Sequence, residues 1–202
     1  MQTPTGRVEV EKRFPNFTFQ LTKSITSGEL NDFSFGKIDL KTEYEKKQLN
    51  GQKTSILVQG GYAFGDLPLT HLYSISPNNI TKETIMQRIT IAGKNSFETM
   101  FYNEFFSSEY LYFQIKHGFQ RITLFKKVKP SFVFVTRMAW GNLHHAERHK
   151  GLDFKTLNQG YFESGVELNQ IYKGLGLVGF YRYGSNGLLK LEDNIAIKLS
   201  YI

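Results

Sequence analysis

The chain contains no cysteine, so disulfide bonds, thiolate metal sites and a cysteine nucleophile are excluded. It also has no run of about 20 apolar residues, the length that a membrane-spanning helix requires. The first stretch, MQTPTGRVEVEKRF, lacks the apolar centre of a signal peptide. For an exported protein, this beginning indicates a fragment or a truncated reading frame.

The aromatic residues are unevenly used, with a single tryptophan beside 18 phenylalanines and 11 tyrosines. The length of 202 residues suits one domain, or one part of a larger domain. The net charge of +7 is spread along the chain between acidic residues. Such a charge permits a phosphate-bearing partner without requiring one, and we expect a lipid rather than a nucleic acid.

The dominant pattern is an alternation of apolar and polar residues. In the final stretch, NIAIKLSYI, an extended strand places Ile195, Ile197, Leu199 and Tyr201 on one face and Lys198 on the other. Alternating segments of about ten residues between turn signals are what a membrane β-barrel requires. We predict eight strands, at 16–26, 33–48, 52–62, 105–119, 131–141, 160–172, 175–184 and 194–202.

The connections between these strands differ in length in an ordered way. Asn50-Gly51 is the preferred pair for a type I′ hairpin turn, and only three residues, Tyr172 to Gly174, separate the sixth strand from the seventh. Two long connections, 64–100 and 142–158, fall at the opposite end. Outer-membrane barrels combine short periplasmic turns with long external loops. The predicted fold is therefore an all-β, antiparallel, up-and-down transmembrane barrel.

Facing strands of this barrel would present charged residues to a wet interior. The alternation places Glu163, Glu167, Arg182 and Lys198 on the inward faces, where we expect opposite charges on adjacent strands to pair. A pore lining selective for ions is the alternative role. The residues predicted to face lipid in the last strand are Ile195, Ile197, Leu199 and Tyr201.

Aromatic residues near the predicted strand ends suit an interfacial girdle, although aromatic residues favour strands in any case. They are Phe14, Phe17, Tyr62, Phe105, Phe119, Tyr172, Tyr183 and Tyr201.

The stretch NLHHAERHK is the strongest candidate for a metal site. It carries His144, His145, Glu147 and His149, and histidines four apart share one face of a helix. The stretch lies in a predicted external loop with basic flanks and no further ligand, so a solvated loop is the preferred interpretation. Its basic residues, Arg148 and Lys150, would suit contact with phosphates of lipopolysaccharide.

A hydrolase triad and a phosphate loop are the remaining chemical candidates. Asp66 and His71 lie near Ser74 and Ser76, but the spacing provides no nucleophile elbow. The glycines at 60, 61 and 65 precede no helix, so we interpret them as bends or close backbone approaches. We predict no catalytic residue, no cofactor and no metal.

Several stretches together resemble a known family. They are RFPNFTFQL, GGYAFGDLPLTHLYSI, ETMFYNEFFSSEYLYFQIKHGF, FKKVKPSFVFVTRMAWGNL, GYFESGVELNQIYKGLGLVGFYRYG and LEDNIAIKLSYI. From about Arg13 onward the chain resembles the C-terminal barrel of a Bacteroidetes outer-membrane family. Full-length members carry a signal peptide and a carboxypeptidase-regulatory-like domain before the barrel, which is similar to the BamA-type surface-antigen barrel.

The resemblance implies that these strands are the second half of a sixteen-stranded barrel whose first half precedes them. It also implies that the last strand engages the barrel-assembly machinery, and that the 64–100 loop folds into the lumen. In the wider superfamily this loop carries an Arg-Gly-aromatic tip. No such tripeptide occurs here, and the nearest arginine is Arg88. An insertase or secretion role is therefore not carried over.

The sequence thus predicts a non-enzymatic outer-membrane β-barrel segment with a structural, transport or assembly-related role. The alternative is a soluble eight-stranded barrel that binds an apolar small molecule. The two interpretations assign the apolar face to opposite sides of the wall. Periodicity alone does not distinguish the inside of a barrel from the outside.

Overall fold

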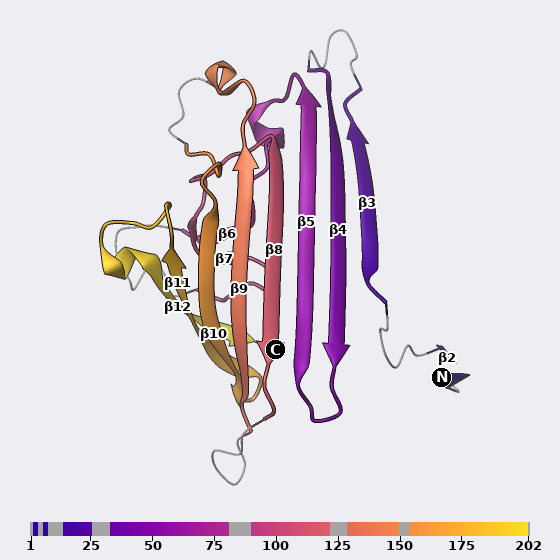
Figure 1. The fold of residues 1–202 in the computed structure, drawn as a ribbon, viewed down its shortest axis with the longest axis vertical. Coiled ribbons are helices and arrows are strands. Elements are labelled where there is room, and N and C mark those ends of the chain that lie inside the picture. The colour runs from indigo at the N-terminus through magenta and orange to yellow at the C-terminus, as the bar shows by residue number, and fades with distance from the viewer. Residues whose placement is uncertain are drawn as a thin grey trace.

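The computed structural model describes residues 2–3, 6–7, 14–25, 33–80, 90–121, 129–149 and 154–201. Eight antiparallel strands form the main sheet, in the spatial order β12-β11-β10-β9-β8-β5-β4-β3 (Figure 1). They are β3 (Asn16–Lys23), β4 (Phe35–Lys47), β5 (Lys53–Gly65), β8 (Glu109–Gly118), β9 (Ser131–Asn142), β10 (Tyr161–Tyr172), β11 (Leu175–Tyr183) and β12 (Ile195–Tyr201). The sheet is open, with β3 and β12 as its edges.

Smaller elements accompany the main sheet. β1 (Gln2–Thr3) pairs with β2 (Gly6–Arg7), and β6 (Pro77–Asn79) pairs in parallel with β7 (Phe97–Phe101). Among the described residues, the short 3₁₀ helices are η1 (Leu69–His71), η3 (Ala146–Arg148) and η4 (Leu191–Asn194). Over the described ranges, no helix is long and apolar enough to cross a membrane.

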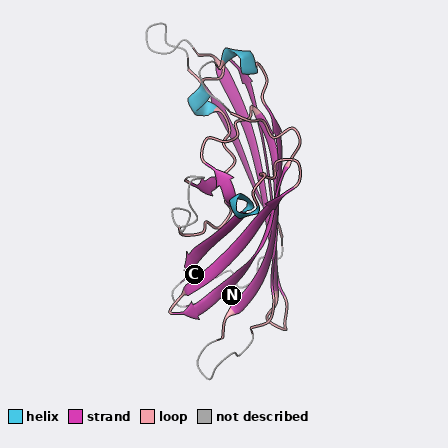
Figure 2. Ribbon diagram, turned by 90° about the vertical axis from the view of Figure 1, so that its left-hand side faces the viewer, coloured by secondary structure: helices cyan, strands magenta, loops and turns pink. Residues whose placement is uncertain are grey.

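The strands of the main sheet lie close to the predicted ranges, with two differences. The strand expected at 105–119 begins at Glu109, because Phe105 leaves the sheet to pack on Tyr161, with ring centroids 5.6 Å apart. Phe105 is only 2% exposed, so its assignment to an interfacial girdle is wrong. The connection expected as an external loop at 64–100 contains β6 and most of β7, and both lie on one side of the sheet (Figure 2).

One of the two tight turns differs in type from the prediction. At the β4–β5 turn only Gly51 has a positive φ, and Gln48 N–H donates to Gln52 O, so a three-residue loop replaces the expected type I′ turn. The two-residue turn with positive φ at both positions occurs instead at Lys173-Gly174. There, Tyr172 faces Leu175 directly. Both turns keep neighbouring strands antiparallel and tightly connected.

The main sheet is curved, and its two faces differ in character. Figure 2 shows the smaller elements on the concave side. Along β12, Ile197 on the convex face is 50% exposed and Lys198 on the concave face is 1% exposed. Exposed apolar side chains cover the convex face of the other strands as well, among them Phe17, Phe19, Leu40, Leu111, Phe134, Leu177 and Tyr181.

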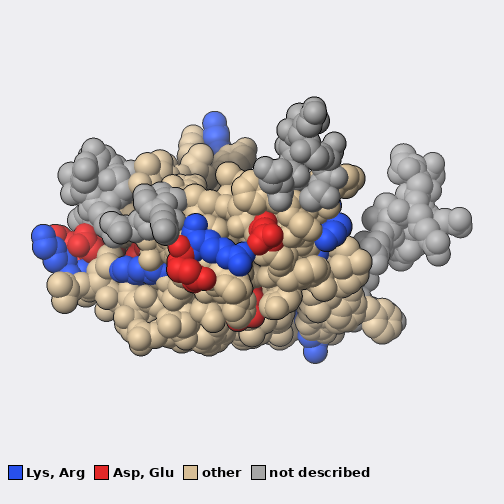
Figure 3. Space-filling view, turned by 90° about the horizontal axis from the view of Figure 1, so that it is seen from above, with Lys and Arg blue, Asp and Glu red and all other residues tan. Residues whose placement is uncertain are grey.

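Charged side chains follow the opposite distribution. In the end-on view of Figure 3 they gather across the middle of the molecule, and the convex side at the lower border consists mostly of other residues. The sheet therefore presents an apolar convex surface, and its buried charged side chains lie on the concave side.

Residues 90–105, which we name the infolded segment, pack against the concave face. All five residues of β7 within this segment are buried. Phe97 contacts Tyr112 and Tyr161 edge to face, with ring centroids 5.3 and 4.9 Å apart. The buried apolar cluster around these rings consists of Leu57, Ile75, Phe97, Met100, Phe105, Tyr112, Ala139, Leu157 and Tyr161. This cluster fixes the position of the infolded segment and of the charged residues beside it.

Candidate functional site

A row of polar side chains crosses the concave face. Strand register places Gln114 of β8 opposite Arg137 of β9, Arg137 opposite Glu163 of β10, and Glu163 opposite Arg182 of β11. Because each of these residues occupies the concave position of its strand, all four side chains point toward the infolded segment. Each is at most 3% exposed. We name this set, with Lys198 of β12, the polar row.

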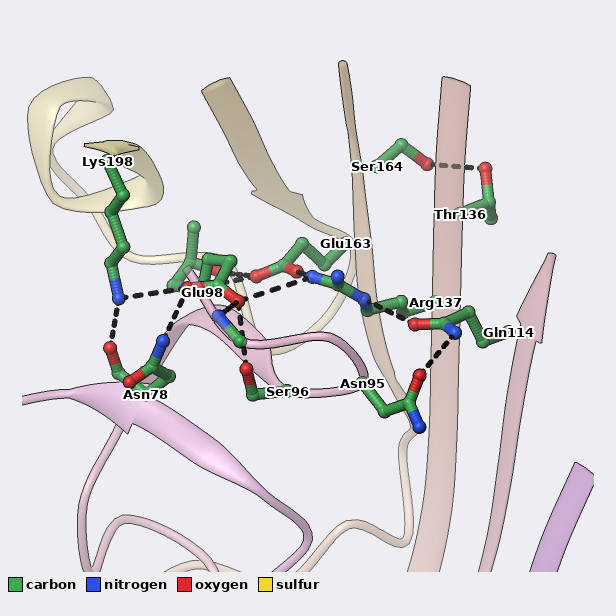
Figure 4. Close-up of polar contacts among 12 residues, drawn as sticks. Asn78, Asn95, Ser96, Glu98, Gln114, Thr136, Arg137, Glu163, Ser164 and Lys198 are labelled. Atoms are coloured by element: carbon green, nitrogen blue, oxygen red, sulfur yellow. Dashed lines mark hydrogen bonds and ion pairs between the residues drawn. The ribbon is translucent and has the colours of Figure 1, made fainter. Parts of the chain in front are cut away.

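Arg137 is the centre of this row. Its Nη1 lies 2.8 Å from Glu163 Oε1, and its Nε donates to Gln114 Oε1 over 2.8 Å (Figure 4). Nη1 is also 3.8 Å from Glu98 Oε1. The guanidinium carbon stands 4.4 Å from the centroid of the Phe180 ring. Arg137, a cation of the main sheet, is thereby held between two carboxylates and an aromatic face.

Glu98 joins the infolded segment to this cation. Its Oε1 accepts hydrogen bonds from Gly93 N–H at 3.0 Å and from Ser96 Oγ at 2.9 Å. Its Oε2 accepts from Asn78 Nδ2 at 2.7 Å and lies 3.1 Å from Lys198 Nζ. Lys198 Nζ also donates to the backbone carbonyl of Asn78. Donors of the infolded segment, of β6 and of the main sheet thus converge on one fully buried carboxylate.

At Thr99, the next residue, the infolded segment provides the donors and the main sheet provides the carboxylate. Glu163 Oε2 accepts from the Thr99 N–H at 2.7 Å and from Thr99 Oγ1 at 2.6 Å. Thr99 Oγ1 is also 2.8 Å from the Tyr161 hydroxyl. Glu163 therefore bridges Arg137 and the backbone of the infolded segment.

Arg182 binds a second carboxylate of the infolded segment. Its Nη1 and Nη2 donate to Glu104 Oε2 and Oε1 over 3.0 and 2.9 Å, a bidentate pair. Arg182 Nε donates to Asn186 O, and the guanidinium lies 4.7 Å from the Tyr161 ring centroid. Planar, two-pronged contact of this kind is the strong form of arginine–carboxylate recognition.

The prediction that inward-facing charges pair between adjacent strands is therefore wrong for two residues. Arg182 and Glu163 are register partners, yet Arg182 pairs with Glu104. Lys198 pairs with Glu98. The reason is the infolded segment, which brings its own carboxylates within reach of both cations. Glu163 does pair with the neighbouring strand, through Arg137.

Glu167 lies apart from this cluster. Its Oε1 is 2.7 Å from Lys116 Nζ, and its Oε2 accepts from Asn169 Nδ2 at 3.0 Å. Both residues of the ion pair line a cavity of about 850 Å³ on the concave side, toward the tight turns. The infolded segment contributes Ala92 to Asn95 to the same cavity. The concave face is thus filled in one part and hollow in another.

His144, His145 and Arg148 of the histidine-rich loop each lie beside a carboxylate. His144 Nε2 lies 3.3 Å from Glu109, His145 Nδ1 lies 3.3 Å from Glu147, and Arg148 pairs with Asp66 at 2.6 Å. Among the described residues, no group of three or more His, Cys, Asp or Glu side chains could hold a metal ion. Lys150 and Arg88 lie outside the described residues.

The residues considered for a hydrolase triad are engaged elsewhere. Asp66 is the partner of Arg148, and the His71 ring packs on Phe35 with centroids 4.6 Å apart. Within the part of the chain that the structure describes, no hydrogen bond joins His71 to Ser74 or Ser76. The three groups thus lack the contacts through which a triad works.

Gly61 is a point of close backbone approach, as interpreted from the sequence. A Cβ placed there would lie 2.5 Å from the Tyr110 ring and 2.7 Å from both Asp39 Oδ1 and the Tyr73 ring. We expect Gly61→Val to lower the free energy of unfolding by about 1–3 kcal/mol, the usual effect of overpacking. Urea titration of the refolded protein measures this. Gly179→Val is the matched control, because no atom lies within 4 Å of a Cβ there, and equal losses would contradict the explanation.

Sequence reasoning missed Arg137, Glu98 and Glu104. Arg137 had a usable signal, because it shares the concave positions of β9 with Val135 and Ala139. The alternation gave no signal for the two glutamates. The resemblance implies that the 64–100 loop, which contains Glu98, folds inward, but it names no charged partner there, and Glu104 lies beyond that loop. Comparison with protein-family models, curated proteins and solved structures finds no match for this chain.

Proposed function

We propose that this chain forms part of the wall of a transmembrane β-barrel in an outer membrane, with a structural, transport or assembly-related role and no enzymatic activity. The observation that carries the proposal is the inverted distribution of side chains. Fully buried Arg137, Arg182 and Glu163 occupy the concave side, whereas apolar residues are exposed on the convex side. Lipid requires an apolar exterior, and a wet interior tolerates charge.

Polar groups at the middle of the convex face support the same proposal. Thr136 Oγ1 lies 3.1 Å from Ser164 Oγ, which lies 3.0 Å from the Tyr183 hydroxyl. The three hydroxyl groups therefore bond to one another across β9, β10 and β11. In lipid no water replaces such partners, so mutual hydrogen bonding is the arrangement that a lipid-facing surface needs.

The infolded segment favours a barrel of more than eight strands. An eight-stranded barrel is just wide enough inside for side chains. Here the concave face holds the backbone of β6 and β7 as well. Further strands at the β3 and β12 edges would enclose this segment, and open edges are not tolerated in lipid. The sixteen-stranded barrel implied by the resemblance provides those strands in an N-terminal half.

The partners of such a wall are outer-membrane lipid, the barrel-assembly machinery at β12, and lipopolysaccharide at the histidine-rich loop. The alternative function, a soluble barrel around an apolar ligand, calls for apolar side chains on the concave face. Beside its apolar cluster, the concave face carries the buried ion pairs of Arg137, Arg182 and Lys198. Side-chain placement thus favours the membrane proposal.

The single tryptophan provides the test. Trp140 lies on the convex face of β9, is 36% exposed and packs on Phe162. We expect its fluorescence to be strongly quenched when the protein is reconstituted in vesicles of brominated phospholipid, because the quencher then contacts the ring.

The matched control moves the probe to the other face. The double variant Trp140→Phe, Tyr112→Trp places the only tryptophan on the buried concave side, where bromine does not reach it. Its emission is expected to be nearly unaffected. Two results would contradict the membrane proposal. One is equal emission of the native protein in brominated and ordinary lipid, and the other is a protein that stays dispersed in buffer without lipid.

A further inference from the structure

We propose that the concave wall around Arg137, Arg182 and Lys198 is a binding surface for small carboxylate anions, which Glu98 and Glu104 of the infolded segment occupy as tethered ligands. This inference rests on the proposed function, and it names the class of solute that the barrel interior would favour. Each of the three cations contacts a carboxylate of the infolded segment.

The Arg182 site has the form of a carboxylate receptor. Both terminal nitrogens contact Glu104, Nε is fixed by Asn186 O, and the Tyr161 ring lies beside the guanidinium. Asn186 is held in turn by the carbonyl of Gly160 at 2.6 Å. Apart from the carboxylate and the Phe105 ring, whose centroid lies 5.7 Å from the guanidinium carbon, these contacts come from the main sheet or its loops. The receptor is therefore assembled without Glu104 and does not depend on it for its shape.

The site of Arg137 and Lys198 has one hydrogen-bond donor group that is not used. Arg137 Nη2 is buried and has no hydrogen-bond partner among the described residues. Lys198 reaches Glu98 Oε2 from the other side of the carboxylate. A guanidinium nitrogen with no acceptor in a buried position is costly, unless water or a ligand oxygen reaches it. An added carboxylate oxygen would fit this donor.

The charge balance of the polar row gives the concave face of the main sheet a preference for anions. Along the polar row, three cations stand beside one wall carboxylate, Glu163. With Glu98 and Glu104 in place the cluster carries three positive and three negative charges; without them it carries a net charge of +2. The neighbouring pair of Lys116 and Glu167 is neutral as a unit. Lys155, 3.7 Å from Glu104, adds a further cation at the rim. A cationic, partly dehydrated wall attracts anions.

The first test is electrical. The full chain and the double variant Glu98→Gln, Glu104→Gln are reconstituted in planar bilayers under a potassium chloride gradient. We expect the variant to conduct several-fold more current than the native protein, with a reversal potential shifted toward that of chloride. Glu147→Gln is the matched control, because it removes an exposed loop carboxylate outside the cluster, and it is expected to behave like the native protein in both respects.

The second test is chemical rescue, which stays informative when a variant folds poorly. Glu104→Ala removes roughly the atoms of acetate from the Arg182 site. We expect added acetate to raise the thermal unfolding midpoint of this variant in a saturable way, since a ligand that binds only the folded state stabilises it. Acetamide, which has the same shape without the charge, is expected to have no such effect, and neither compound should shift the midpoint of Glu167→Gln.

The outcomes separate the inference from the function on which it rests. A cation-selective current in the glutamate variant, or acetate and acetamide acting alike on Glu104→Ala, overturns the carboxylate-binding surface while the barrel remains. Trp140 emission that is equal in brominated and ordinary lipid overturns the proposed function itself.

Discussion

Replacing Arg137 by leucine is expected to lower the free energy of unfolding by about 3–5 kcal/mol, the usual consequence of removing one partner from a buried ion pair. The substitution leaves the Glu163 and Glu98 carboxylates buried without their shared cation. It also removes the donor to Gln114 Oε1. Urea-induced unfolding of the reconstituted protein, followed by Trp140 fluorescence, measures the change.

The matched control is Arg148→Leu. Arg148 also pairs with a carboxylate, Asp66, at the shorter distance of 2.6 Å, but both side chains are more than half exposed. Exposed pairs contribute only about 0–1 kcal/mol, because water solvates the separated charges. If the two substitutions destabilised the protein equally, the polar row would not be a buried, water-excluding site.

Replacing Ile197 by lysine is expected to prevent stable insertion into a bilayer. Ile197 lies at the middle of β12 on the convex face. A lysine on the lipid face of a barrel costs roughly 2–4 kcal/mol at the bilayer midplane. On a water-exposed sheet the same substitution would change stability by only about 0.5 kcal/mol. The fraction of protein that resists extraction from vesicles at high pH, compared with the native chain, measures insertion.

Leu189→Lys is the matched control for this substitution. Leu189 is fully exposed in the connection between β11 and β12, outside any strand. A lysine there is expected to leave insertion unchanged. Normal insertion of Ile197→Lys would mean that the convex face of β12 does not meet lipid.

The placement of Ile197 and Lys198 on opposite faces shows what the alternation of apolar and polar residues can predict. Successive side chains of a strand point to opposite faces whatever surrounds the strand. Local sequence therefore predicted the eight strands and the two faces of β12. The tight connection at Tyr172 to Gly174 was also readable, because glycine tolerates a positive φ; Lys173, with φ of 47°, was not an obvious second position.

Other features depend on contacts between distant parts of the chain. The bond between Arg182 and Glu104 joins residues 78 apart, and that between Glu163 and Thr99 joins residues 64 apart. The alternation of apolar and polar residues does not predict that residues 90–105 turn back onto the concave face. For the same reason, sequence reasoning assigned Phe105 to a strand and paired the wall charges with one another.

The sequence by itself determined the strands, their faces and the ends at which the connections are short, because these follow from backbone geometry over neighbouring residues. Only the tertiary structure decided the open sheet, the infolded segment and the partner of each buried charge. A buried charge takes whichever opposite charge and hydrogen-bond donors the fold brings within about 3 Å, and the position of β7 against the wall settles that choice.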